Sequence, residues 1–170
     1  ALSIHYLFGQ GTPVDLEKAF RLAQAAYQHD VAYANGILGY LYAEALGTPR
    51  SLLRAVEHFQ KGADAGDGYS ADRLPVVQAE LECQRLAGDP HEDGAYGLGV
   101  TWEALQPEAA IAACAAALDA NPETVGDMVW LGRAYARDEQ LDAAVPLLQQ
   151  GVTAGNPLAQ LIMGDMLLAG

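Results

Sequence analysis

Side chains that could carry out catalysis are few in this chain of 170 residues. None of the Ser residues lies in the glycine-flanked turn that exposes a hydrolase nucleophile. Cys114 and His91 are of the types that form a thiolate and its base, but nothing in their spacing favours that pairing. The remaining candidates have no catalytic context: Ser3, Ser51, Ser70, His5, His29, His58, Lys18 and Lys61. The inventory predicts that the chain is not an enzyme.

Two short segments superficially resemble ligand sites. His91, Glu92 and Asp93 are metal-ligand types, but three adjacent side chains cannot all point at one ion. The Gly94-x-x-Gly97-x-Gly99 run lacks the preceding strand and the glycine order of a dinucleotide-binding loop, so it is interpreted as a flexible stretch. We therefore expect neither a metal nor another cofactor.

The two cysteines allow two interpretations. Cys83 and Cys114 are thirty-one residues apart with no second pair of ligands, so a zinc site is not predicted. They are either two buried free thiols or a single disulfide. The disulfide would imply an oxidising compartment, and on that ground alone a periplasmic or secreted location is favoured over the cytoplasm.

Acidic side chains outnumber basic ones throughout, with a formal net charge of −13. Such a balance disfavours nucleic acids and anionic membranes as partners and favours a neutral or basic one. No apolar run is long enough to cross a bilayer, so membrane insertion is not expected. The first residues lack a basic start and are not predicted to be a signal peptide.

Arg133 and Arg137 are the only Lys or Arg side chains in residues 86–170. They are one helical turn apart and should leave the same side of a helix. Their guanidinium groups could bind a carboxylate or phosphate of a peptide. The alternative is that they neutralise nearby acids such as Asp138, Glu139 and Asp142.

Internal repetition dominates the organisation of the chain. Shifting residues 1–34 by thirty-six places Tyr6 on Tyr42, with matching Gly and Thr-Pro turns. The turns end one helix, and Asp15 and Ser51 are the expected N-caps of the next. A later copy aligns Leu38-Gly39 with Leu131-Gly132, and residues 157–170 begin another.

The pattern Leu-Gly-x-x-Tyr, turn, Ala-x-x-x-Phe/Leu-x-x-Gly resembles the tetratricopeptide repeat. The longer spacing and the Ala-Gly ending resemble its Sel-one-like variant. The resemblance implies an all-α fold, a right-handed solenoid of antiparallel helix pairs (helix A, then helix B). One array would cover the chain: 1–34, 35–68, 69–122 with an insertion near 88–106, 123–156, and a partial repeat 157–170.

Glycines within helix A should mark close packing against helix B. Gly39, Gly132 and Gly164 each follow an apolar anchor, and a helical Gly costs about 1 kcal/mol. Close approach of the partner helix would offset that cost. Because one hairpin cannot bury its apolar face alone, neighbouring repeats must stack.

Residues 71–106 interrupt the repeat. We expect a helix from about Leu74 to Leu86, with Pro75 tolerated in its first turn. Residues 88–106 are then either a long insertion between helix A and helix B, or the segment GAYGLGVTWEAL is itself a helix A. We prefer the insertion, because it keeps the A–B alternation and sets Cys83 and Cys114 on facing helices.

The resemblance implies a protein-protein interaction scaffold or adaptor that binds a protein or peptide on the concave face of its A helices. By resemblance that face includes Tyr33, Tyr40 and Val129, and it continues to Arg133 and Arg137. Tyrosine suits recognition because it offers a large, stiff contact area. The alternative is a regulatory or accessory segment of a larger enzyme or of an envelope or exopolysaccharide assembly, where bacterial members occur.

Overall fold

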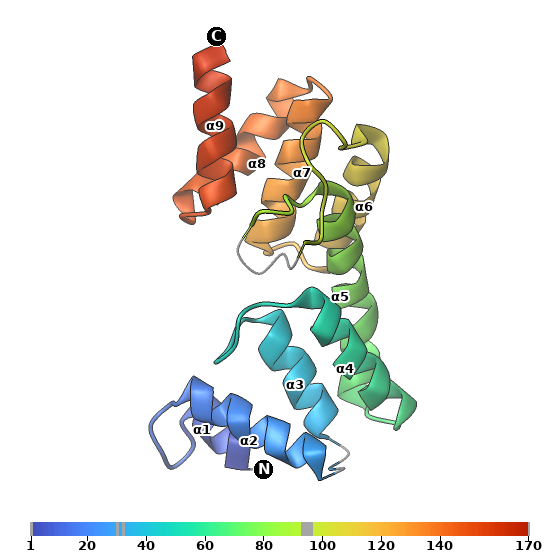
Figure 1. Cartoon of the computed structure of the whole chain (residues 1–170), viewed down its shortest axis with the longest axis vertical. Coiled ribbons are helices and arrows are strands. Elements are labelled where there is room, and N and C mark those ends of the chain that lie inside the picture. Colours follow the sequence, from blue (N-terminus) through green and yellow to red (C-terminus); the bar gives the residue numbers. More distant parts are fainter. Residues whose placement is uncertain (1, 30, 32, 93–96, 170) are drawn as a thin grey trace. The chain divides into compact units, whose positions relative to one another are not determined.

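The computed structural model describes residues 2–29, 31, 33–92 and 97–169. These residues form nine α-helices and no strand, which confirms the all-α prediction. The helices are α1 Leu2–Phe8, α2 Leu16–Gln28, α3 Ala34–Ala43, α4 Leu52–Asp64, α5 Gly68–Ala87, α6 Pro107–Ala120, α7 Val125–Arg137, α8 Leu141–Thr153 and α9 Pro157–Ala169 (Figure 1).

The helices gather into two compact units. Unit 1 covers Ala1–Gln78 and unit 2 covers Ala79–Gly170, so the boundary falls inside α5. In unit 1, α1 packs on α2, α2 on α3, and α3 on α4. In unit 2, α6 packs on α7, α7 on α8, and α8 on α9. Neighbours along the chain are thus neighbours in space, as expected of stacked hairpins.

The predicted N-caps start the second helix of each hairpin in unit 1. The Asp15 carboxylate accepts a hydrogen bond from the backbone N–H of Lys18 at 2.9 Å. The Ser51 hydroxyl accepts one from the N–H of Arg54 at 3.4 Å. Both residues have extended backbones, so each side chain satisfies an N–H that the helix itself leaves without a partner. These two caps are confirmed.

Glycine on helix A allows close packing in two of the three predicted places. A Cβ on Gly39 would lie 2.7 Å from the ring of Phe59, which is fully buried on α4. A Cβ on Gly132 would lie 2.9 Å from Leu148 on α8. The prediction for Gly164 is wrong, because nothing lies within 4 Å of its added Cβ. Among the described residues, no helix covers that side of α9.

The repeated turn has a steric requirement at Gly47. Its φ of +69° lies in the left-handed region, and a Cβ there would come 2.1 Å from the carbonyl oxygen of Leu16. The turn after α3 therefore touches the first turn of α2. Only glycine fits at this position. At the equivalent Gly11 the space is open, and the feature that the two positions share is a positive φ, +75° at Gly11, which favours glycine.

Helix α5 begins earlier than predicted. It starts at Gly68 rather than near Leu74, so Pro75 lies inside the helix and not in its first turn. The reason is an unrecognised cap: Asp67 accepts a hydrogen bond from the N–H of Ser70 at 3.2 Å. The structure corrects the predicted start by six residues.

A connection joins α5 to α6 in unit 2. Residues 88–92 and 97–106 form turns and irregular structure, and residues 93–96 lie outside the described part. The described part of GAYGLGVTWEAL is therefore not a helix A. That the connection is an insertion between two helices of one repeat stays a prediction.

Candidate functional site

A groove in unit 1 brings together side chains from three helix A positions. It has a volume of about 460 Å³ and runs between α1, α3 and the start of α5. We call it the tyrosine groove, after its three tyrosines. Its lining residues are Ile4, Leu7, Phe8, Tyr33, Gly36, Ile37, Tyr40, Asp67 and Tyr69.

Two predicted partner-binding residues lie in the tyrosine groove. Tyr33, at the N-cap of α3, is 51% exposed, and Tyr40 is half-buried about two helical turns further along α3. Sequence reasoning missed Tyr69, which is 47% exposed on α5. The signal was available, because the shift of thirty-six that reveals the repeat also aligns Tyr33 with Tyr69. Equivalent tyrosines of successive repeats thus line one groove.

One carboxylate forms part of the groove wall. Asp67 Oδ2 accepts hydrogen bonds from the N–H and the hydroxyl of Ser70. The same oxygen lies against α3, because a Cβ on Gly36 would come within 2.6 Å of it. Burial raises the pKa of the neighbouring Tyr69; the charge of Arg73 opposes that shift, and Asp67 makes a small contribution that raises it. The groove is thus apolar and aromatic with one fixed negative group.

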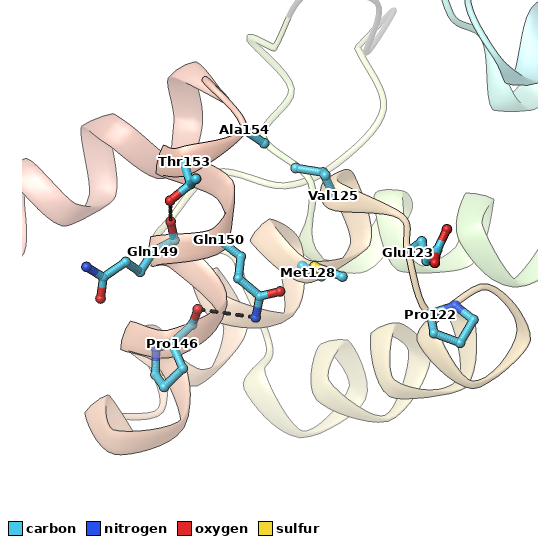
Figure 2. A pocket seen from close by; sticks show the side chains of 9 residues that line it. All are labelled: Pro122, Glu123, Val125, Met128, Pro146, Gln149, Gln150, Thr153 and Ala154. Atoms are coloured by element: carbon cyan, nitrogen blue, oxygen red, sulfur yellow. Dashed lines mark hydrogen bonds between the residues drawn. The ribbon is translucent and has the colours of Figure 1, made fainter.

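A second hollow lies in unit 2, between the start of α7 and the outer side of α8. Its volume is about 670 Å³, and Figure 2 shows its lining of Pro122, Glu123, Val125, Met128, Pro146, Gln149, Gln150, Thr153 and Ala154. Gln150 Nε2 donates to the Pro146 carbonyl at 3.4 Å, and the Thr153 hydroxyl donates to that of Gln149 at 2.8 Å (Figure 2). These groups bond to their own helix, and no aromatic side chain lines the hollow. It offers fewer anchors for a partner than the tyrosine groove.

The structure places Arg133 in the interior of unit 2. Only 1% of the residue is exposed. Its guanidinium donates to the carbonyl oxygens of Ala87 at 2.8 Å, Gly88 at 3.1 Å and Val100 at 2.9 Å. Its Nη2 also lies 3.4 Å from Asp89 Oδ2. The prediction that Arg133 binds a peptide is therefore corrected. Carbonyl oxygens of the same chain already accept the hydrogen bonds of its guanidinium group.

The alternative prediction, that Arg133 neutralises acidic residues that follow it in the sequence, is also corrected. Arg133 pairs with Asp89 across the connection, not with Asp138, Glu139 or Asp142. Arg137 Nε donates to the carbonyl oxygen of Trp102 at 3.1 Å, and its guanidinium lies 5.9 Å from that ring. Arg137 is half-buried and Trp102 is 40% exposed.

Glu92 makes a second contact between the connection and α7. Its Oε2 accepts a hydrogen bond from Trp130 Nε1 at 2.7 Å, and burial raises the pKa of its carboxyl. A role in metal binding with His91 is not supported by this geometry, and the third member, Asp93, lies outside the described residues. Over the part of the chain that the structure describes, no group of three His, Cys, Asp or Glu is arranged to hold a metal.

Val129 does not lie on a binding face. It is fully buried, and a Cβ on Gly151 would come 2.4 Å from its Cγ2. The expectation that Val129 contacts a partner is therefore wrong. The residue packs α7 against α8, because it belongs to the side of helix A that faces helix B.

Cys83 on α5 and Cys114 on α6 lie together in the core of unit 2. Both are fully buried, their Cα atoms are 4.5 Å apart, and their sulfur atoms are bonded. The bond closes a loop that contains the whole connection. The redox state of the two cysteines in solution remains a prediction.

The fold defines the class of protein first. Short antiparallel helices pack on their neighbours along the chain, so this is an α-helical repeat protein. Residues 1–31 and residues 32–67 each match the model of the Sel1 repeat. These matches support the Sel1-like repeats that the repeat pattern predicts, over the first 67 residues of the chain. No curated protein matches the sequence.

Sel1 repeats are generally protein-protein interaction modules, and proteins built from them are typically not catalysts. No helix in the described ranges is long and apolar enough to span a membrane.

Proposed function

We propose that this chain binds a segment of a partner protein in the tyrosine groove. The observation that supports the proposal most directly is that the repeated elements each contribute tyrosines to the lining of the groove. Tyr40 lies on α3, Tyr69 lies on α5, and Tyr33 directly precedes α3. Tyr33 and Tyr69 hold equivalent positions in successive repeats. Repetition thus builds an extended aromatic surface from one small motif.

The groove residues are of the kind that supplies binding energy. Tyr33, Tyr69 and Phe8 are each about half exposed, so a partner would remove apolar ring surface from water. Tyrosine loses little conformational entropy on binding, and its hydroxyl can bond to a peptide backbone. A few such residues dominate the affinity of a typical interface.

The thin catalytic inventory supports binding rather than catalysis. His58, a half-buried histidine of unit 1, donates from Nδ1 to Asn35 Oδ1 at 3.0 Å and is stacked on Tyr42. These two neighbours of its ring are thus an amide and an aromatic ring, and neither is a nucleophile that a histidine would activate. The tyrosine groove contains no histidine, cysteine or lysine.

Selection of peptides from a displayed random library on the immobilised chain tests the proposal. The amide signals that shift when a selected peptide is added identify the binding surface. We expect the shifts at Gly36, Ile37 and Tyr69. Saturable binding that shifts only signals of unit 2, for example around Met128, would contradict the proposed site.

A further inference from the structure

The tyrosine groove combines aromatic rings with one carboxylate and with no basic side chain. Among the described residues that line the groove, Asp67 is the only one that carries a charge at neutral pH, and none of them is Lys or Arg. An apolar wall beside a single negative group suits a side chain that has an apolar stem and a positive tip.

Two neighbouring residues, Ser70 and Gly36, fix the position of the Asp67 carboxylate. Oδ2 accepts from the N–H of Ser70 at 3.2 Å and from its hydroxyl at 2.5 Å. The missing Cβ of Gly36 leaves the space that this oxygen occupies. Both hydrogen bonds use Oδ2, so the negative charge is held at the wall while neither bond engages Oδ1.

Aromatic rings beside a carboxylate favour a cation in two ways. The face of a tyrosine ring attracts ammonium and guanidinium groups, more strongly where water is excluded. Unit 1 already contains such contacts: Lys18 Nζ lies 4.1 Å from the centre of the Tyr6 ring, and Lys61 Nζ lies 5.4 Å from that of Tyr27. The methylenes of a lysine or arginine would cover Ile4 and Ile37.

Charge near the groove argues against an anionic ligand. Arg73, on the same helix as Tyr69, is 3.8 Å from Glu44 and is paired with it. The chain as a whole carries a formal charge of −13, which attracts cations at long range.

We propose that the tyrosine groove takes a lysine or arginine side chain of the partner, with its tip at Asp67 and its stem on the rings. This rests on the proposed function of the same groove and specifies the chemistry of the anchor. The partner segment is therefore basic.

Titration of the full chain with single blocked amino acids tests the anchor. The probes are the N-acetyl methylamides of lysine, arginine, norleucine and glutamate, followed by amide chemical shifts in low salt. Norleucine keeps the stem of lysine without its charge. We expect the lysine and arginine probes to shift Gly36 and Tyr69 with an affinity about tenfold above that of norleucine.

Two variants separate charge from fold. Asp67→Asn removes the charge but keeps a good helix cap, so it should reduce the preference for lysine over norleucine to about twofold or less. Asp64→Asn is the matched control, because Asp64 is exposed on α4, outside the groove, and bonds to Gln60. It should leave the preference unchanged.

Equal affinity for lysine and norleucine would overturn the basic anchor, and so would a preference for glutamate or the absence of any shift at the groove. Peptides selected from the library would still bind at Gly36 and Tyr69 in those cases if the groove is the site. Failure of the anchor is thereby distinguished from failure of the proposed function.

Discussion

Arg133 Nη2 on α7 lies 2.9 Å from the carbonyl oxygen of Val100, in the connection between α5 and α6. The same guanidinium reaches the carbonyl oxygens of Ala87 and Gly88, where α5 ends. One buried side chain therefore ties the start of the connection, and Val100 within it, to α7. A charge-assisted fork of this kind fixes direction as well as distance.

Arg133→Gln should destabilise unit 2 strongly. The change removes the donors of three carbonyl oxygens and leaves the partly buried Asp89 without its cation, at a cost of about 3–5 kcal/mol. Urea unfolding measures the loss. Arg137→Gln is the control, since Arg137 is half-buried and makes one hydrogen bond to Trp102, worth about 1 kcal/mol. Equal effects of the two changes would show that Arg133 does not hold the connection.

Gly39→Ala and Gly164→Ala should change stability in opposite directions. The added methyl group at Gly39 meets the Phe59 ring at 2.7 Å, and overpacking of this kind costs about 1–3 kcal/mol. At Gly164 the space is open, so the better helix propensity of alanine should add up to about 1 kcal/mol. Thermal unfolding of both variants gives the comparison. Stabilisation by Gly39→Ala would refute close packing of α3 on α4.

His58 should make the protein less stable in mild acid. Burial, with a smaller contribution from Lys61, lowers the pKa of His58 from 6.5 to about 4. The unfolded chain therefore binds a proton at a pH where the folded chain does not. Stability is complete above pH 6.5 and falls as the pH drops towards 4.

Urea midpoints measured between pH 7 and pH 4.5 test the role of His58. His58→Gln should flatten the pH dependence, although it also loses the stacking on Tyr42. His29→Gln is the control, because His29 is exposed after α2. Both variants contain the same carboxylates. Identical pH dependences of the urea midpoint would therefore exclude His58 as the source of the acid sensitivity.

The two cysteines should give no free thiol when the unreduced protein is unfolded. Cys83 and Cys114 are bonded in the structure, and they are 31 residues apart in the sequence. Closing a loop of that length should stabilise the chain by about 3–4 kcal/mol. Thiol titration decides the point. Two free thiols would reject the disulfide, and with it the reason for favouring an oxidising compartment.

Repetition and capping made much of the fold predictable. Asp15 and Ser51 begin helices where predicted, and Gly39 and Gly132 pack closely against helix B. These features depend on neighbours within one hairpin, which the repeat pattern specifies. Gly164 fits the same pattern in sequence but lacks a covering helix among the described residues.

Contacts between distant segments were not predictable in the same way. The sequence shows that Arg133 and Arg137 share a helix side, but not that carbonyl oxygens of an irregular connection lie there. An irregular segment has no periodicity from which its path can be derived. Tyr33 and Tyr40 were predicted because the repeat pattern places them on the binding face of the family, whereas Phe8 and Asp67 lie at helix ends outside that pattern.

The affinity of a library-selected peptide for two variants tests the central claim most directly. Tyr33→Ala combined with Tyr40→Ala should weaken binding at least tenfold, because these rings are proposed as anchors of the groove. Leu53→Ala is the matched control, since Leu53 is 44% exposed on α4 and does not line the groove. It should change the dissociation constant less than about twofold. Equal affinity for the double variant and the control would contradict a binding function of this groove.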